Sequence, residues 1–295
     1  MPPAVTAITL ATVRIDLHTH STASDGTDSP AQVLERAAAA AIDVVALTDH
    51  DSIAGWEEAA AAVEPTGVVL VRGAEVSASA GGIPVHILSY LHDPADRALA
   101  QLLEHTRTMR VRRGRAMVEG LARDFPITWE AVVALAGDAQ TVGRPHMADA
   151  LVAAGVFPDR DAAFVRVLHN SGPYHLPLEA PHPRDVVTAI RAAGGVPVMA
   201  HPLAAKRGRV VGDDVIADLV DHGLAALEAF HRDHDPAAVV HARTLAARLG
   251  IPVTGASDYH GAGKPNRLGE NLTTEAVFEA LVGQGRIEVL RPAAG

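Results

Sequence analysis

The histidines and carboxylates of this chain gather in short segments, and almost every segment follows an apolar, strand-like run. Imidazoles and carboxylates together are typical ligands of hydrolytic metal centres, and a chain without cysteine offers metals only nitrogen and oxygen. The candidate ligands, in chain order, are His18, His20, Asp25, His50, Glu75, His86, His201, Asp258 and His260. These types predict a centre that holds more than one metal ion.

Spacing and position strengthen this interpretation. Side chains alternate along a strand with a period of two residues, so both imidazoles of His18-Thr19-His20 lie on one side. A single pair of this kind is more often two ordinary histidines than a metal site. Repeated placements at the ends of strands are improbable by coincidence, and in an α/β barrel that is where functional residues lie.

The elements that would position these residues alternate between strand and helix, which is typical of a mostly parallel α/β fold. We predict strands at 13–17, 44–47, 68–71, 84–91, 196–200, 224–230 and 251–255. We predict helices at 29–41, from the segment after 51 to 63, and at 183–193, 236–249 and 274–282.

The alternation stops after residue 94, and helical patterns and turns follow without a convincing parallel strand. We therefore predict a discontinuous barrel, 14–94 and 182–290, with a small helical domain inserted at 95–181. The first helix of this insertion is rich in arginine. It would be either a solvated face or a track for RNA phosphates.

Composition limits the classes of function. The 295 residues suffice for a barrel with an insertion, and no apolar stretch approaches the roughly 18 residues of a membrane span. A net charge of −10 argues against bulk attraction to nucleic acid, and 3% aromatic residues argue against an extended base-stacking platform. Residues 1–13 lack the basic start of a signal peptide, so we expect a cytoplasmic protein.

The ordered motifs resemble those of the PHP (polymerase and histidinol phosphatase) family. The resemblance lies in Asp16-Leu17-His18-Thr19-His20-Ser21, Thr48-Asp49-His50-Asp51, Gly73-Ala74-Glu75, Ala200-His201-Pro202 and Ser257-Asp258-Tyr259-His260. Further segments are similar to the TrpH/YciV branch of that family: Gly143-Arg144-Pro145-His146, Ser171-Gly172-Pro173-Tyr174 and Gly194-Gly195. The resemblance implies a distorted (β/α)7 barrel with a small helical insertion. It also implies phosphoesterase activity on nucleotides or on the 5′ ends of short RNA.

The resemblance further implies a division of the ligands among metal ions. The sets would be His18, His20, Glu75 and Asp258 for one ion, Asp25, His50 and His260 for a second, and Glu75, His86 and His201 for a third. Two or three divalent ions are expected, with Mn²⁺ favoured by the resemblance, although Fe²⁺ and Zn²⁺ also suit these ligands. Asp16, Asp49 and Asp51 are expected to orient histidine N–H groups.

Charge favours a phosphate substrate. With neutral histidines, the carboxylates Asp25, Glu75 and Asp258 contribute about −3, which two divalent ions turn to about +1 and three to about +3. The expected reaction is in-line attack of a metal-activated water on phosphorus, without a protein nucleophile. The leaving group would take its proton from a metal-bound water or from His231 or His234.

Several cationic residues are candidate substrate contacts. Arg144 and His146 open a predicted helix of the insertion, and a guanidinium suits two-point binding of a phosphate. A local ion pair explains Arg144 equally well. His234 and Lys264 are further candidates, whereas Arg207 belongs to a basic run of the kind that is usually solvated.

We therefore predict a metal-dependent phosphoesterase acting on nucleotide phosphates, as a nucleoside 3′,5′-bisphosphate phosphatase, a 5′–3′ exonuclease on short 5′-phosphorylated RNA, or both. Its partner is a small phosphorylated substrate or an RNA 5′ end, with no membrane and no obligate protein partner expected.

The alternatives are a histidinol-phosphate phosphatase and a non-catalytic PHP barrel stapled by metals that serves as a binding module. Segment 143–146 counts against the first, and the complete ligand set counts against the second. The ligand types also suit an amidohydrolase. That class, however, has a lysine bridging its metals, and no lysine here lies at a strand end among the ligands.

Overall fold

The computed structural model describes residues 13–293. The prediction about a signal peptide therefore concerns a segment, 1–13, that lies almost wholly outside the described residues. Within the described range, no helix combines the length and apolar character that a membrane crossing requires.

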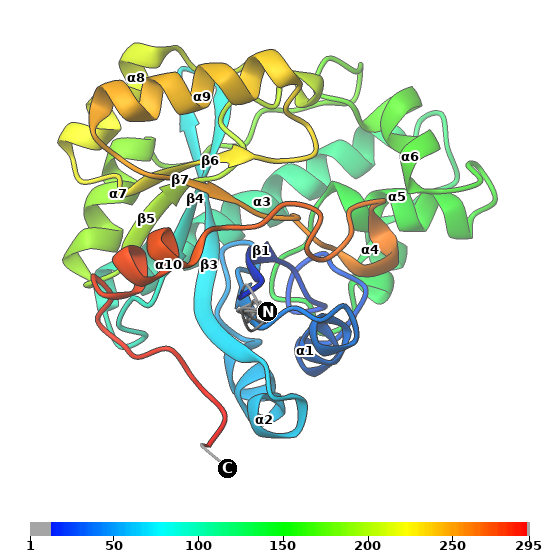
Figure 1. Cartoon of the computed structure of the whole chain (residues 1–295). Coiled ribbons are helices and arrows are strands. Elements are labelled where there is room, and N and C mark those ends of the chain that lie inside the picture. The colour runs from blue at the N-terminus through cyan, green and yellow to red at the C-terminus, as the bar shows by residue number, and fades with distance from the viewer. Residues whose placement is uncertain (1–12, 294–295) are drawn as a thin grey trace, which may run out of the picture.

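Seven strands form one sheet in which the order in space follows the order in the chain (Figure 1). The strands are β1 (Ile15–Thr19), β2 (Val44–Leu47), β3 (Val69–Ala80), β4 (Ile83–Tyr90), β5 (Val196–Met199), β6 (Ala226–Phe230) and β7 (Val253–Gly255). A parallel bridge between Thr19 and Tyr259, just beyond β7, brings the two edges together. The sheet is thus a nearly closed barrel, and the predicted α/β barrel is confirmed.

The sheet is mostly parallel, as predicted, but two neighbouring strand pairs are antiparallel. β3 pairs antiparallel with β4, and β4 pairs antiparallel with β5, whereas the other pairs are parallel. The chain reverses between β3 and β4 at Gly81 and Gly82, both with positive φ, as a tight two-residue hairpin requires. This hairpin places His86 opposite Ser77, two residues from Glu75.

Helices cover the outside of the barrel (Figure 1). They are α1 (Pro30–Ala39), α2 (Trp56–Thr66), α7 (Pro183–Ala192), α8 (Asp213–Asp221), α9 (Pro236–Leu249) and α10 (Glu275–Val282). The start of α1 follows from its sequence, because Ser29 and Gln32 form a reciprocal capping box and Pro30 suits the first turn. The helix α8 was not predicted.

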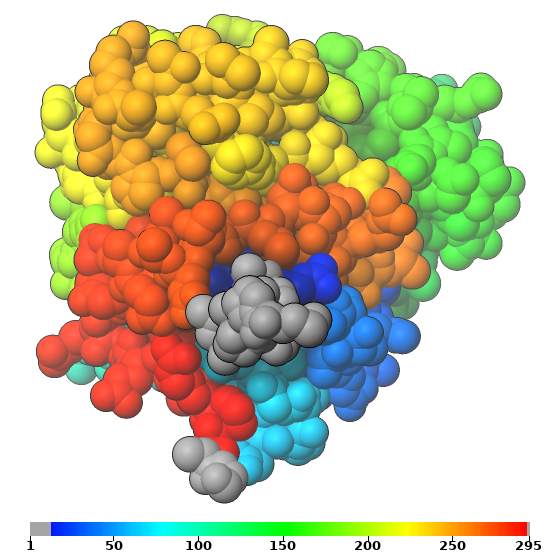
Figure 2. Space-filling model, viewed as in Figure 1, coloured from blue at the N-terminus to red at the C-terminus, as the bar shows by residue number. Residues whose placement is uncertain are grey.

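The region between β4 and α7 is helical, with α3 (Arg97–Leu121), α4 (Trp129–Ala136), α5 (Arg144–Ala153), α6 (Arg160–Ala163) and a π-helical turn (Phe164–Leu168). The end of α3 packs with α4 and α5 in a hydrophobic cluster of its own, whereas Leu99 and Leu103 at its start belong to the core around β3, β4 and α7. The helices α4, α5 and α6, coloured green, lie at one side of the molecule (Figure 2). The domain boundaries at 95 and 181 stay a prediction.

One face of the barrel strands changes from apolar to polar along its length. On β4, side chains two residues apart share a face, so His86 lies on the same face as Leu88 and Tyr90, both of the buried core. The Tyr90 hydroxyl donates to the Leu17 carbonyl at 2.8 Å. On β6, Glu228 shares a face with Ala226 of the same core. The core thus fills one end of the barrel and leaves the other end to polar side chains.

Candidate metal centre

All nine predicted ligands meet in one cluster at the polar end of the barrel. Three of them lie on the strands β1, β3 and β4. The others lie in the segments that follow β1, β2, β5 and β7. Seven are buried, and the side chains of His86 and His201 remain 23% and 9% exposed. The side chains of His50 and Asp25 are also slightly exposed, at 11% and 8%, so the cluster opens to solvent on the side of these four residues.

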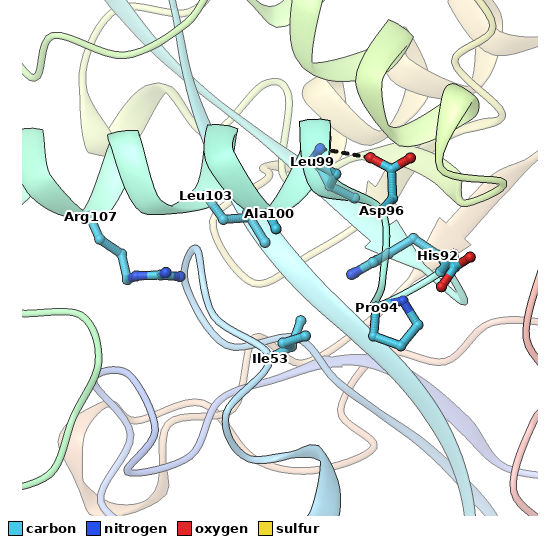
Figure 3. A pocket seen from close by; sticks show the side chains of 9 residues that line it. Ile53, His92, Pro94, Asp96, Leu99, Ala100, Leu103 and Arg107 are labelled. Carbon is cyan, nitrogen blue, oxygen red and sulfur yellow. Dashed lines mark hydrogen bonds between the residues drawn. The ribbon is translucent and has the colours of Figure 1, made fainter.

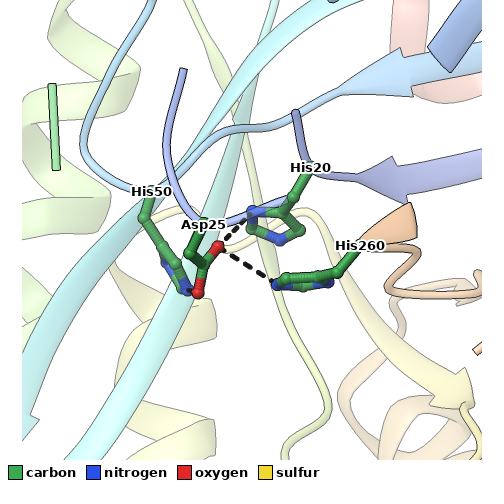
Figure 4. Close-up of side chains that lie close together, drawn as sticks. All are labelled: His20, Asp25, His50 and His260. Atoms are coloured by element: carbon green, nitrogen blue, oxygen red, sulfur yellow. Dashed lines mark ion pairs between the residues drawn. The ribbon is translucent and has the colours of Figure 1, made fainter. Parts of the chain in front are cut away.

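The ligand atoms fall into overlapping groups whose members lie within 4.8 Å of one another. The groups are His20, Asp25, His50 and His260; His18, Glu75 and His201; His18, His20 and Asp258; and His50, Glu75 and His86. Figure 4 shows the first of them, in which Asp25 Oδ1 lies 3.2 Å from His260 Nε2 and 3.7 Å from His20 Nδ1. Ligands held about 2.1 Å from one ion lie about 3.0–3.5 Å apart, which most of the cluster's separations match.

Glu75 lies at the centre of the cluster, with its two oxygens facing different histidines. Its Oε1 lies 2.8 Å from His86 Nδ1 and 3.0 Å from His201 Nε2. Its Oε2 lies 3.0 Å from His50 Nδ1 and 3.2 Å from His20 Nε2. This geometry suits a carboxylate that bridges two cations.

The donor set passes a test of fit to divalent ions. Three ring nitrogens, His50 Nδ1, His86 Nδ1 and His260 Nε2, are buried without a hydrogen-bond partner among residues 13–293. Each lies 2.8–3.2 Å from a carboxylate oxygen, yet the angles are not those of hydrogen bonds. Leaving such groups unsatisfied costs about 1–3 kcal/mol each. A cation between nitrogen and oxygen removes that cost.

Two histidines are held in the tautomer that a metal needs. His18 Nδ1 donates to Glu228 Oε1 at 3.1 Å, and His260 Nδ1 donates to the Asp258 carbonyl at 2.8 Å. Both partners can only accept, so the proton lies on Nδ1 and the lone pair of Nε2 faces the cluster. The two rings therefore present the nitrogen lone pairs that ligation requires.

The cluster gathers buried carboxylates whose charge acts on the histidines around them. Burial raises the pKa of Glu75, but the nearby His86, His50 and His18 outweigh it and hold that pKa well below its ordinary range. Burial lowers the pKa of His20, but Asp258 and Glu75 outweigh it and raise that pKa to about 9. Without cations, protons on histidine therefore balance the carboxylates, and divalent ions would replace them.

Glu228 and Arg207 belong to the site and were not predicted. Glu228 is buried in the middle of β6, and its Oε2 accepts from the His201 backbone N–H at 2.7 Å. A lone glutamate inside the apolar run 224–230 was the available signal. Arg207, interpreted from the sequence as part of a solvated run, donates to Asp258 Oδ2 at 2.6 Å and to Asp233 at 2.7 Å.

The predicted proton donors and Lys264 have different surroundings. Lys264 Nζ lies 3.2 Å from Asp258 Oδ2, beside the cluster. His231 Nδ1 accepts from the Asp233 backbone, so its Nε2 carries the proton and lies 3.5 Å from Asp258 Oδ2. Both nitrogens of His234 bond backbone groups, the Ala229 carbonyl and the Leu203 N–H. Both ring nitrogens of His234 are thus already occupied, and its role as an acid, base or substrate contact stays a prediction.

Arg144 and His146 lie at the start of α5. Arg144 donates to the Leu168 carbonyl and to Asn170 Oδ1, and it pairs with no carboxylate among the described residues. A local ion pair therefore does not account for it. His146 is buried, accepts from the Gly143 N–H, and has a pKa lowered by burial against the pull of Asp25.

The aspartates expected to orient histidines instead hold the ligand-bearing loops. Asp49 accepts from the backbone and hydroxyl of Ser21 and from Ser24 Oγ, just before Asp25. Asp51 accepts from Ser77 in the same way, and Asp16 accepts from the backbone N–H groups of residues 257 and 269. A carboxylate that accepts several N–H and O–H hydrogen bonds from a loop holds the backbone of that loop in place, rather than orienting a single histidine ring.

A cavity of about 190 Å³ lies outside the cluster, between α3 and the segments around Ile53 and Pro94 (Figure 3). None of the nine predicted ligands lines it. Arg107 on its wall donates to the Asp51 carbonyl at 2.5 Å, so the cavity backs onto the loop that carries His50.

Comparison with known proteins agrees with this geometry. The family model described as PHP domain matches residues 16–138. A 3′,5′-nucleoside bisphosphate phosphatase of Chromobacterium violaceum is 33% identical over 281 residues, which cover 95% of this chain and 99% of that protein. The chain belongs to the PHP family. This PHP protein is therefore a phosphoester hydrolase, as its motifs predicted.

Other relatives of this PHP protein also cleave phosphate esters. A phosphoribosyl 1,2-cyclic phosphate 1,2-diphosphodiesterase of Eggerthella lenta is 35% identical over 83% of the chain and 94% of its own length. A 5′-3′ exoribonuclease of Haemophilus influenzae is 35% identical over 65% of the chain and 70% of its own. The crystal structure of a metal-dependent phosphoesterase from Bifidobacterium adolescentis superposes with a TM-score of 0.90 at 40% identity, covering 92% and 96% of the two chains.

Proposed function

We propose that this PHP protein hydrolyses phosphate esters of nucleotides, with nucleoside 3′,5′-bisphosphates as small substrates and the 5′ ends of short RNA as chain substrates. The observation that best supports this proposal is the cluster itself, in which three buried ring nitrogens face carboxylate oxygens without forming hydrogen bonds to them. The relatives from C. violaceum and H. influenzae support the two substrate classes.

We propose two or three divalent ions. The nitrogen and oxygen donor set suits Mn²⁺, Fe²⁺ or Zn²⁺, and Mn²⁺ comes first because the resemblance to the PHP family favours it. His18, His20, Glu75 and Asp258 would hold one ion. Asp25, His50 and His260 would hold the second, and Glu75, His86 and His201 the third. When bound, the ions would activate water and stabilise charge on the phosphate.

The other residues of the site would orient its ligands and move a proton. Glu228 fixes the tautomer of His18, and Arg207 and Lys264 occupy Asp258 Oδ2, which leaves Oδ1 for the cluster. His231 carries a proton on Nε2 beside the same oxygen, so it is our proposed donor to the leaving group.

A second candidate is hydrolysis of a cyclic phosphodiester of ribose, favoured by the E. lenta relative at 35% identity. The same metal cluster would serve it, because attack on a diester also needs activated water and charge stabilisation. The two candidates differ only in substrate.

Product analysis separates these candidates, because a bisphosphate or histidinol phosphate releases inorganic phosphate, RNA releases mononucleotides, and a cyclic phosphodiester opens to a phosphate monoester. The protein is depleted of metal, reloaded with Mn²⁺ and incubated with adenosine 3′,5′-bisphosphate, a 5′-phosphorylated RNA oligomer, a ribose 1,2-cyclic phosphate and histidinol phosphate. We expect turnover of the bisphosphate or the RNA, abolished by chelation and by His50→Ala. Turnover of the cyclic phosphate or histidinol phosphate alone would reject the proposed substrate, and no turnover with metal bound would favour the binding module.

A further inference from the structure

Three arginines of the insertion gather beside the metal cluster. Arg110 and Arg113 lie on α3, three residues apart and hence on one side of the helix, and Arg144 opens α5. Arg110 NH1 comes within 3.7 Å of the position that a Cβ on Gly143 would occupy, next to Arg144. The Arg110 guanidinium thus lies beside the start of α5, and the charges of both Arg110 and Arg144 act on Arg113. We call these three residues the arginine cluster.

The arginine cluster is tied to both sides of the metal centre. Arg110 donates to Asp51 Oδ2 at 2.7 Å and to Ser77 Oγ. Asp51 follows His50 in the chain, and Ser77 pairs with His86 between β3 and β4. Arg144 donates to Asn170 Oδ1 at 2.5 Å, and the amide of Asn170 donates to the carbonyl of Arg207, the residue that holds Asp258. The cluster therefore has a fixed position next to the centre.

The arginine cluster lacks an anion. Its one close carboxylate is Asp51, already bonded by Arg110, and neither Arg113 nor Arg144 forms an ion pair within residues 13–293. Arg113 Nε is buried without a hydrogen-bond partner in the same range. The pKa of Arg113 is lowered to about 9, mainly by burial and further by the charges of Arg110 and Arg144, against the opposing pull of Asp51. Gathering like charges in this way is unfavourable unless a ligand neutralises them.

We propose that the arginine cluster binds the second, uncleaved phosphate of the substrate, with Arg113 and Arg144 as its ligands and Arg110 as their fixed support. A phosphate offers the several acceptor oxygens that two planar guanidinium groups match. The subsite selects substrates that carry two phosphates one nucleoside apart, which describes a nucleoside 3′,5′-bisphosphate and the first linkage of an RNA chain. This inference rests on the proposed function.

The competing interpretation is that the arginines only join the insertion to the barrel. Arg110 fits it, since its donors are satisfied by Asp51 and Ser77. Arg113 does not, because an arginine that only joins two segments would donate to partners on both, and its Nε has none. Arg113 is therefore the residue to vary, and the neighbouring Arg112, exposed on the same helix, is the matched control.

The test compares Arg113→Gln and Arg112→Gln in the Mn²⁺-loaded protein, on adenosine 3′,5′-bisphosphate and on p-nitrophenyl phosphate, which has no second phosphate. We expect Arg113→Gln to lower kcat/KM for the bisphosphate by about 10- to 100-fold, mainly through KM, and for p-nitrophenyl phosphate by less than about threefold. Arg112→Gln should leave both unchanged. Equal losses on both substrates, or no loss on either, would overturn the inference.

Binding to the metal-depleted protein separates this inference from the proposed function. Calorimetry should show weaker binding of adenosine 3′,5′-bisphosphate to Arg113→Gln than to the parent protein, with adenosine alone unaffected. Binding that depends on Arg113 without turnover by the parent would reject the proposed function and retain the subsite. Turnover of the bisphosphate with binding that ignores Arg113 would retain the function and reject the subsite.

Discussion

Glu228 on β6 joins two candidate metal ligands from different strands. Its Oε1 accepts from His18 Nδ1 at 3.1 Å, and its Oε2 accepts from the backbone N–H of His201 at 2.7 Å. The carboxylate is fully buried, and burying it is tolerable only because both oxygens are bonded. Glu228 therefore sets the tautomer of one ligand and the position of the other.

The substitution Glu228→Gln should weaken metal binding without unfolding the protein. The amide keeps one acceptor oxygen, but its NH₂ group would face a donor, either His18 Nδ1 or the His201 N–H. Substitutions of this kind beside metal ligands typically cost 10- to 100-fold in affinity, and we expect a loss of about that size for Mn²⁺ by calorimetry. Glu279→Gln, at an exposed position, is the control. Unchanged Mn²⁺ affinity in Glu228→Gln would refute this role.

Most of the nine predicted ligands could be found from the sequence because they follow a repeated rule, histidine or carboxylate at or just past the end of an apolar run. His86, inside β4, was assigned as a ligand through the family resemblance. Glu228 breaks that rule, since it lies inside a strand and no spacing partner marks it. Arg207 could not be found, because its contacts with Asp258 and Asp233 arise only when three loops meet. Tertiary contacts of this kind leave no local pattern.

The length of β3 is a different case, since the signal was present. After Arg72, the apolar Ala74, Val76 and Ala78 alternate with polar residues, the period-two pattern of a strand. That alternation and the pair Gly81-Gly82 together predict a hairpin, and with it the antiparallel pairing. The prediction named no hairpin here, because it ended this strand at residue 71, before the alternating segment begins.

The stability of the metal-free protein should fall between about pH 6.5 and pH 9. The pKa of His20 rises to about 9, since Asp258 and Glu75 outweigh burial, and that of His18 also rises above its ordinary value. A group with a raised folded-state pKa contributes stability that is full below its unfolded pKa and is lost as pH rises through the folded value.

Urea unfolding in the presence of a chelator at pH 6.5 and pH 9 checks this expectation. Protein loaded with Mn²⁺ should lose less stability over the same range, because the ions take the place of the protons and bind more tightly as pH rises. A metal-free protein that becomes more stable toward pH 9 would contradict the charge balance described for the cluster.

The variant His231→Gln should slow cleavage according to the leaving group. His231 carries a proton on Nε2 at 3.5 Å from Asp258 Oδ2, so its loss removes the proposed proton donor. We expect kcat to fall about 100-fold for adenosine 3′,5′-bisphosphate, whose ribose oxygen needs a proton. p-Nitrophenyl phosphate should change little, because its leaving group departs unprotonated. Equal decreases for both substrates would exclude His231 as the donor.

The variant Tyr90→Phe tests the barrel rather than the chemistry. The Tyr90 hydroxyl donates to the Leu17 carbonyl, which links β4 to β1 across the barrel next to His18. Its removal leaves a buried carbonyl without that partner, so we expect a loss of about 1–2 kcal/mol in the free energy of unfolding. Chemical denaturation measures it, and a variant as stable as the parent would show that this bond does not hold the barrel.

Anomalous diffraction from crystals soaked in Mn²⁺ tests the central claim most directly, because it locates the ions without relying on activity. We predict at least two peaks inside the cluster, each about 2.0–2.5 Å from its ligand atoms, with one peak beside Glu75 if two ions bind and two peaks beside it if three bind. Glu75→Gln crystals should lose or weaken the peak at that residue. Manganese absent from the cluster, or bound only at the surface, would contradict the assignment of these nine residues as the metal centre.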